Sequence, residues 1–172
     1  MTDLTQYIRD VPDYPKPGIL FKDITPLFAD PAALGQTVDL LAAWAEPRKP
    51  DIVLGAEARG FILGAALALR LGCGFVPARK PGTLPWHTVA VKYSLEYGFD
   101  ELEVHADAFP KGARVLVHDD LLATGGTSKA LLELVEQLGG TVVGVAFIIE
   151  LAFLDGRAKL GAGYDVHSLI TY

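Results

Sequence analysis

A pair of adjacent carboxylates followed by a glycine-rich turn is the part of this sequence with the most chemical content. Residues 115–128, VLVHDDLLATGGTS, run from an apolar stretch through Asp119 and Asp120 into a turn at 123–127, after which a helix is predicted. The two glycines of the turn permit backbone conformations in which successive N–H groups point into one concavity. Hydroxyl side chains and the positive end of the helix dipole add to the attraction for an anion. The segment therefore predicts a binding site for a phosphate monoester.

The two carboxylates need a partner other than the phosphate, because like charges repel. Adjacent hydroxyls of a sugar, or a metal-bound sugar, suit Asp119 and Asp120 best. The alternative is structural: a helix-capping turn beside a solvated acid pair. Neither a Gly-Lys-Ser/Thr phosphate loop nor a G-x-G-x-x-G dinucleotide fingerprint occurs in the chain. The order of apolar strand, two acids and glycine–hydroxyl turn favours a sugar phosphate.

Strands that alternate with helices must position this segment. Apolar runs at 52–54, 75–78, 114–118, 142–149 and 166–170 predict strands, and helices are predicted from Asp30-Pro31 onward and at 61–71, 128–138 and 151–160. Strands that are apolar throughout indicate an α/β fold with a central, mostly parallel sheet flanked by helices. Ligands of such sheets bind at the carboxyl ends of the strands. The proline-rich residues 1–30 are expected to form an irregular hood, and 80–107 a hairpin or a long mobile loop.

Composition narrows the class of protein. The chain has 172 residues, enough for a single domain over 1–172, with 15 Lys and Arg against 21 Asp and Glu and a net charge of −6. This acidic balance argues against a nucleic-acid or anionic-membrane partner, since phosphate backbones require concentrated basic residues. The single Cys73 cannot form an internal disulfide, and the start of the chain has no apolar signal core. We expect a cytoplasmic protein.

Several segments together carry a family resemblance. Residues 115–128 resemble the phosphoribosyl-pyrophosphate signature of the type I phosphoribosyltransferases. The whole chain resembles the adenine phosphoribosyltransferases of that family, through PKPGILFKDITP at 15–26, GAEARGF at 55–61, RKPGTLP at 79–85, YSLEYG at 93–98 and ELAFLDGR at 150–157. The amino-terminal FKDITP and the SLEYG segment are the parts that point to adenine.

The resemblance implies a reaction in which adenine displaces pyrophosphate from phosphoribosyl pyrophosphate and gives AMP. Its catalytic residues would be Glu96, Asp119, Asp120 and Arg59. The ribose and 5′-phosphate would be bound by Asp119, Asp120, Ala123, Thr124, Gly125, Gly126 and Thr127. The carboxylates would stabilise positive charge that develops on the sugar ring. Whether one of them is also a general base stays open.

The pyrophosphate would be bound by Arg59, Arg79, Lys80 and Tyr97. Mg²⁺, the implied cofactor, would be held mainly by the substrate and by no direct protein ligand. The resemblance also implies a cis peptide at Glu57–Ala58. A solvated surface role is the alternative for each of the three cations.

The adenine would lie on the hood, bound by Leu20, Phe21, Lys22 and Leu151, with Phe21 and Leu151 as the two slabs. Main-chain groups of Leu20 and Lys22 would read the base, and Glu96 would approach its N7. Alternatively, Leu20 and Phe21 plug the edge of the core, and Glu96 is an exposed loop acid.

Departures from the family pattern and rival functions remain at this point. Lys22 replaces a common arginine, Thr83 a basic residue, and His118 an aliphatic one. The resemblance implies a homodimer. The rivals are a sibling transferase for another base and a non-catalytic regulator that senses phosphoribosyl pyrophosphate.

Overall fold

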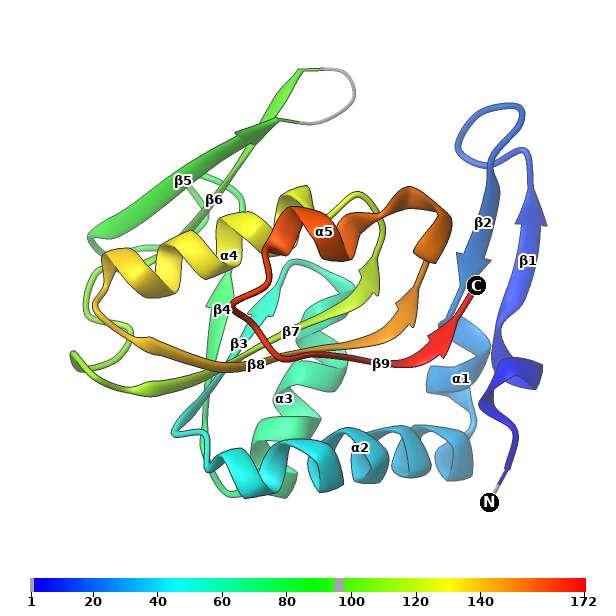
Figure 1. Cartoon of the computed structure of the whole chain (residues 1–172), viewed down its shortest axis with the longest axis horizontal. Coiled ribbons are helices and arrows are strands. Elements are labelled where there is room, and N and C mark those ends of the chain that lie inside the picture. The colour runs from blue at the N-terminus through cyan, green and yellow to red at the C-terminus, as the bar shows by residue number, and fades with distance from the viewer. Residues whose placement is uncertain (1, 95–97) are drawn as a thin grey trace.

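A parallel sheet of five strands forms the centre of the molecule (Figure 1), in a computed structural model that describes residues 2–94 and 98–172. The strand order is β4-β3-β7-β8-β9, with bounds β3 Ile52–Ala56, β4 Gly74–Ala78, β7 Arg114–Leu122, β8 Thr141–Glu150 and β9 Val166–Thr171. The predicted α/β class is confirmed. The three central strands are almost entirely buried, which explains their continuous apolar sequences.

Helices cover both faces of this sheet (Figure 1). α2 (Pro31–Ala45) and α3 (Arg59–Leu71) lie on one face, and α4 (Gly126–Gln137) and α5 (Gly156–Leu160) lie on the other. Asp30 caps α2 as predicted, because its carboxylate accepts hydrogen bonds from the main-chain N–H groups of Ala32 and Ala33. A short 3₁₀ turn, η2 (Glu46–Arg48), follows α2. No helix in the described part of the chain is long and apolar enough to cross a membrane.

The hood carries more secondary structure than expected. It contains η1 (Leu4–Tyr7), an antiparallel ribbon of β1 (Arg9–Pro12) and β2 (Leu20–Asp23), and α1 (Thr25–Ala29). Two of its four prolines, Pro15 and Pro17, fall in the loop between the two strands. That loop turns through positive φ at Asp13 and Gly18, and the Gly18 N–H donates to Asp13 Oδ1 at 2.8 Å. The ribbon stands at one end of the sheet, beside the carboxyl terminus (Figure 1).

The segment predicted as a hairpin or loop is a hairpin. β5 (Thr88–Ser94) pairs with β6 (Phe99–His105) in a separate antiparallel sheet that packs on α4. In Figure 1 this ribbon rises on the side of the molecule opposite the hood. The hood ribbon and the hairpin therefore flank the edge at which the parallel strands end.

Several element boundaries differ from the prediction, and the largest differences are at β7 and at 151–160. β7 continues four residues beyond His118, because Asp119, Leu121 and Leu122 still pair with β8. The single helix predicted at 151–160 is instead η3 (Ala152–Leu154) followed by α5, with Asp155 between them at a φ of 51°. A helix cannot run through this left-handed residue.

Candidate active site

A pocket of about 390 Å³ lies at the carboxyl ends of β3, β4 and β7. It is lined by Glu57, Ala58, Arg59, Lys80, Tyr93, Asp100, Leu102, Asp119, Asp120, Leu121, Ala123 and Thr127. These residues come from the turn after β3, the end of β4, the hairpin, and the end of β7 with the following turn. The position agrees with the general rule for parallel sheets.

The two carboxylates at the end of β7 are buried, at 9% exposure for Asp119 and 7% for Asp120. Asp120 Oδ2 accepts a hydrogen bond from Arg59 Nε at 2.5 Å, so these two predicted catalytic residues are in contact. Asp119 Oδ1 accepts the Asp120 N–H at 2.8 Å. Gly60 makes room for this carboxylate, since a Cβ there would lie 2.9 Å from Asp119 Oδ1.

Burial, together with the adjacent Asp120 charge, raises the pKa of Asp119 well above its ordinary value. A carboxyl group in this state binds a proton more readily than an exposed aspartate does. That is compatible with a neighbouring substrate that is itself highly anionic.

The turn at 123–127, which we call the phosphate loop, connects β7 to α4. Gly125 has a φ of 81° and precedes the first residue of α4, a conformation that favours glycine. Gly125 also lies against Gly156 of α5, where a Cβ on Gly125 would be 2.5 Å from the Gly156 carbonyl oxygen. Thr127 Oγ1 lies 3.5 Å from the Tyr93 hydroxyl. The loop thus places main-chain N–H groups and one hydroxyl at the start of a helix.

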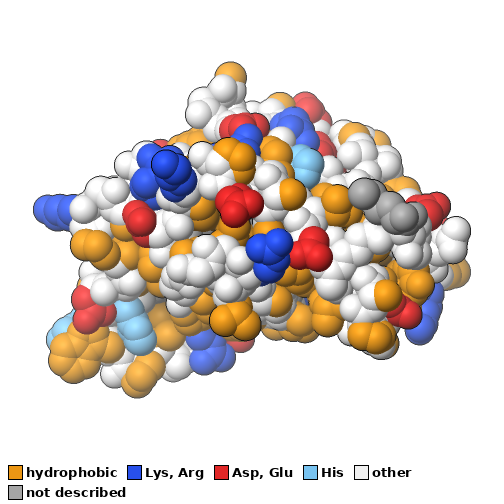
Figure 2. Space-filling model, turned by 90° about the horizontal axis from the view of Figure 1, so that it is seen from below, with side chains coloured by type: hydrophobic (Ala, Val, Ile, Leu, Met, Phe, Trp, Pro, Cys, Tyr) orange, Lys and Arg blue, Asp and Glu red, His pale blue; other side chains and the backbone are white. Residues whose placement is uncertain are grey.

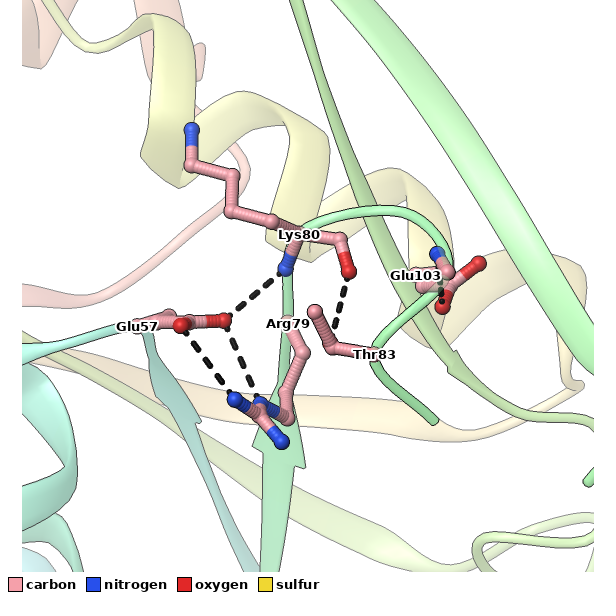
Figure 3. A network of polar contacts seen from close by, with 6 residues as sticks. Glu57, Arg79, Lys80, Thr83 and Glu103 are labelled. Carbon is pink, nitrogen blue, oxygen red and sulfur yellow. Dashed lines mark hydrogen bonds and ion pairs between the residues drawn. The ribbon is translucent and has the colours of Figure 1, made fainter. Parts of the chain in front are cut away.

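Two of the predicted pyrophosphate cations, Arg79 and Lys80, contact Glu57 in the turn after β3, whereas Arg59 contacts Asp120. The Glu57–Ala58 peptide is cis, as the resemblance implied. Figure 3 shows the Glu57 carboxylate accepting hydrogen bonds from the Lys80 N–H at 2.9 Å and from Arg79 Nε and Nη2 at 3.3 and 3.4 Å. These bonds, with that from Lys80 as the strongest, lower the pKa of Glu57. Glu57 therefore holds Lys80, which lines the pocket, and Arg79, which is not among the lining residues.

Two hairpin residues of the pocket were not singled out by sequence reasoning. Asp100 of β6 forms an ion pair with Lys80 and accepts a hydrogen bond from the Tyr93 hydroxyl at 3.1 Å. Burial would raise the pKa of Asp100, but the Lys80 ammonium and the other hydrogen bonds outweigh it and lower the pKa. The available signal was the hairpin register, which places Tyr93 opposite Asp100.

Phe21, one of the four residues predicted to bind the base, lines a second, open pocket of about 240 Å³ together with Val11, Tyr14, Asp23 and Arg59. The rings of Tyr14 and Phe21 meet edge to face at 5.1 Å between centroids. The Arg59 guanidinium lies 5.2 Å from the Phe21 centroid. Arg59 lines both pockets, so it connects the hood with the carboxylates of β7.

The other residues predicted at the base site lie as follows. Leu20 is half exposed, and the Lys22 ammonium contacts Asp10 Oδ1 at 2.6 Å and lies 3.8 Å from the centre of the Tyr172 ring. Leu151 packs against a core cluster that contains Ile24 and Leu27, and it lines neither pocket. Glu96 and Tyr97 lie outside the described residues.

Comparisons with known proteins identify this arrangement. The family model for the phosphoribosyl transferase domain matches residues 31–164. The fold and site thus define a phosphoribosyltransferase. The adenine phosphoribosyltransferase of Rubrobacter xylanophilus is 61% identical over 165 residues, which cover 96% of this chain and 89% of that protein.

Solved structures agree. The adenine phosphoribosyltransferase of Thermoanaerobacter pseudethanolicus is 54% identical, with a TM-score of 0.95 and 98% of each chain covered. That of Saccharomyces cerevisiae, complexed with an imino-altritol bisphosphate and adenine, is 40% identical, with a TM-score of 0.92 and 96% of each chain covered. The chain belongs to the adenine phosphoribosyltransferase family, whose members are pentosyl-transferring enzymes.

Proposed function

We propose that the two connected pockets carry out the adenine phosphoribosyltransferase reaction, in which adenine and phosphoribosyl pyrophosphate give AMP and pyrophosphate. In this reaction a bond forms between N9 of adenine and C1′ of the ribose. The bond between C1′ and the pyrophosphate oxygen breaks, its electron pair leaves with the pyrophosphate, and the ring N–H proton of adenine is lost to the pyrophosphate or to water. The single observation that carries the proposal is the position of Arg59, between the hood pocket and Asp120.

The ribose-phosphate end of the substrate would be bound by β7 and the phosphate loop. N–H groups of the loop and the Thr127 hydroxyl would hold the 5′-phosphate, aided by the dipole of α4. Asp119 and Asp120 would face the ribose 2′ and 3′ hydroxyls. Because both carboxylates are buried and fixed by hydrogen bonds, they can stabilise positive charge on the ring without reorganising.

The pyrophosphate end would be bound by Arg59, Arg79 and Lys80. Each of these cations is paired with a carboxylate, with Asp120, Glu57 and Asp100 respectively. A pyrophosphate that enters the pocket would share or replace these partners, so the cations are positioned before the substrate arrives.

Mg²⁺ fits this pocket as an ion that arrives with the substrate. Within residues 2–94 and 98–172, no group of three or more His, Cys, Asp or Glu side chains could hold a metal ion. Asp119 and Asp120 would instead hold the ribose hydroxyls of the substrate with which the ion would arrive. When bound, Mg²⁺ supplies charge neutralisation for the leaving group.

Adenine would bind in the hood pocket, with its flat face against Phe21. Main-chain groups of Leu20 and Lys22 would bind its polar edge, since β2 pairs with β1 on one side only. We still propose that Leu151 contacts the other face of the adenine, although in the structure its side chain packs in the core. Glu96 near N7 and Tyr97 near the pyrophosphate remain predictions.

A cytoplasmic homodimer is the assembly we propose. Figure 2 shows the face formed by α2 and α3, on which hydrophobic side chains lie among charged ones. Ile62 and Leu69 of α3 are 50% and 84% exposed, which favours their burial by a second copy. Light scattering should give twice the chain mass of 18.4 kDa. The mass of a single chain would contradict the dimer.

Pyrophosphate release tests the proposed reaction. The protein is incubated with Mg²⁺ and phosphoribosyl pyrophosphate, and adenine, hypoxanthine, guanine and orotate are offered separately. We expect turnover with adenine and loss of this turnover when a chelator removes Mg²⁺. Preference for another base would indicate a sibling transferase. No turnover with any base would favour a regulator that only binds phosphoribosyl pyrophosphate.

A further inference from the structure

The phosphate loop rests directly on the first residue of α5. A Cβ on Gly156 would lie 2.1 Å from the Ala123 carbonyl oxygen and 3.1 Å from the Gly125 nitrogen. Real Cβ atoms do not approach backbone so closely, so only glycine fits at position 156 with the loop in this conformation. The main chain at the start of α5 therefore packs directly against the main chain of the phosphate loop.

The intrinsic stability of α5 as a helix is too low to keep it against the phosphate loop. It has five residues, and a left-handed residue, Asp155, precedes it. Helices this short are unstable in isolation, because nucleation costs more than one turn of hydrogen bonds returns. Something outside the helix must fix it against the loop.

An ion pair at the end of β8 provides this fixation. Glu150 accepts hydrogen bonds from Arg157 Nε at 2.9 Å and Nη2 at 2.5 Å, and from Ser168 Oγ at 2.7 Å. Arg157 Nη1 also donates to the Val166 carbonyl oxygen at 2.8 Å. Arg157 directly follows Gly156 in the chain. Its side chain thus connects the last residue of β8 with the first residue of β9.

The carboxylate of this pair is the buried member. The Glu150 side chain is 8% exposed and that of Arg157 is 47% exposed. Hydrogen bonds from Arg157 lower the pKa of Glu150, so the carboxylate stays ionised at neutral pH. A forked contact to a buried, ionised carboxylate is geometrically strict, unlike most exposed ion pairs.

We propose that Glu150 and Arg157 are positioning residues for the 5′-phosphate: their ion pair holds Gly156 against the phosphate loop and so fixes the loop N–H groups. This inference rests on the proposed role of the loop. Neither residue touches the substrate in this account. Their effect passes from Glu150 to Arg157, from Arg157 to Gly156, and from Gly156 to Ala123.

The direct test compares Gly156→Ala with Gly163→Ala. Gly163 lies just beyond α5, at an ordinary φ, and has open space around its Cβ position, so it is the matched control. Alanine favours a helix over glycine, so propensity alone would make Gly156→Ala harmless. We expect Gly156→Ala to raise KM for phosphoribosyl pyrophosphate at least about tenfold, because small displacements of positioned groups are costly. KM for adenine should stay the same, and Gly163→Ala should behave as wild type.

Arg157→Met tests the ion pair at a distance from the loop. Amide hydrogen exchange at 123–127 in the substrate-free protein should accelerate in Arg157→Met and in Gly156→Ala, with KM changed in the same selective way. Arg157→Lys, which keeps the charge and loses the fork, serves if the methionine variant does not fold. Unchanged exchange at 123–127 in Gly156→Ala and in the folded Arg157 variant would overturn the inference.

The same measurement separates this inference from the proposed phosphate site. If phosphoribosyl pyrophosphate fails to protect 123–127 in the wild type, the phosphate site is wrong. Accelerated exchange in the two variants would still support the contact between α5 and the loop.

Discussion

The ribose-phosphate half of the site and the base half are built in different ways. The first comprises the end of β7, the phosphate loop and α5, where both carboxylates are less than a tenth exposed and two glycines pack backbone on backbone. The second is a two-stranded ribbon outside the main sheet, where Tyr14 is 53% and Leu20 49% exposed. The phosphoribosyl transferase model begins at residue 31 and so leaves the ribbon out.

This difference suits what we propose that each half binds. A phosphorylated sugar whose ring gains charge needs dipoles and carboxylates that are fixed in advance. A flat heterocycle needs an aromatic face and a few main-chain groups, which an exposed ribbon can provide. The buried half therefore suits the chemistry common to the wider family, and the ribbon suits the choice of base.

The largest effect is expected at the buried half. Asp120→Asn removes a negative charge that faces the ribose and weakens the contact with Arg59. We expect kcat to fall about 100- to 1000-fold, the usual cost of losing one fixed electrostatic contact to a transition state. Adenine binding, measured by calorimetry, should change little. Asp107→Asn, at an exposed acid, is the control, and an unchanged kcat in Asp120→Asn would remove the ribose-facing role.

The next effect concerns stability beneath the carboxylates. His118 is fully buried, and burial lowers its pKa to about 4. Its Nδ1 lies 3.0 Å from the Ala146 carbonyl oxygen, and its Nε2 has no hydrogen-bond partner among the residues that the structure describes. Below pH 6.5, the ordinary pKa of histidine, His118 is protonated in the unfolded chain but stays neutral in the folded chain. The free energy of unfolding therefore falls as the pH drops from 6.5 toward 4.

His118→Val should remove that part of the pH dependence. The wild type is expected to lose about 3 kcal/mol of unfolding free energy at pH 4 through this residue. Urea unfolding at a series of pH values measures the loss. Parallel stability curves for wild type and His118→Val would show that His118 does not titrate as described.

Arg59 lines the pockets of both halves, so its substitution tests whether the two halves act separately. Arg59→Met should raise KM for phosphoribosyl pyrophosphate roughly 10- to 100-fold, the range expected for a lost hydrogen bond to a charged group. A smaller rise in KM for adenine should accompany it, because Arg59 also lines the hood pocket. Steady-state kinetics with each substrate varied in turn give both values. An unaltered KM for phosphoribosyl pyrophosphate would return Arg59 to a surface-charge role.

The smallest effect should be confined to the base half. Phe21→Ala removes the stacking face, and stacking of a base on an aromatic ring contributes about 1–3 kcal/mol. We expect KM for adenine to rise about tenfold, with KM for phosphoribosyl pyrophosphate unchanged. Phe153→Ala is the control, because the Phe153 ring is exposed and lines neither of the two pockets. Equal changes in both KM values would mean that the halves are not separable.

Sequence reasoning reached the buried half more completely than the exposed one. Each central strand is one apolar run, and the order of carboxylates, glycine turn and helix is local, so β7, the phosphate loop and α4 followed from adjacent residues. The end of β7 did not, because its pairing with β8 continues through two polar residues. The contact of Gly156 with Ala123 joins segments that are far apart in the chain, and no local signal marks it.

Tyr14 of the hood ribbon and Asp100 of the hairpin show the opposite case. Tyr14 lies among prolines and appeared to be part of an irregular arm, yet the turn places its ring against Phe21. Asp100 stood within an acidic run typical of solvated loops, and only the hairpin register directs it toward Lys80. Tertiary pairing decided both positions.

A comparison of two hydrogen-exchange footprints tests most directly the claim that one site runs from the phosphate loop to the hood. Exchange is measured for the free protein, with ribose 5-phosphate, and with AMP. We predict that both ligands protect 123–127 and that only AMP also protects 20–22. Protection of 20–22 by ribose 5-phosphate alone, or no added protection there with AMP, would contradict the division into two halves.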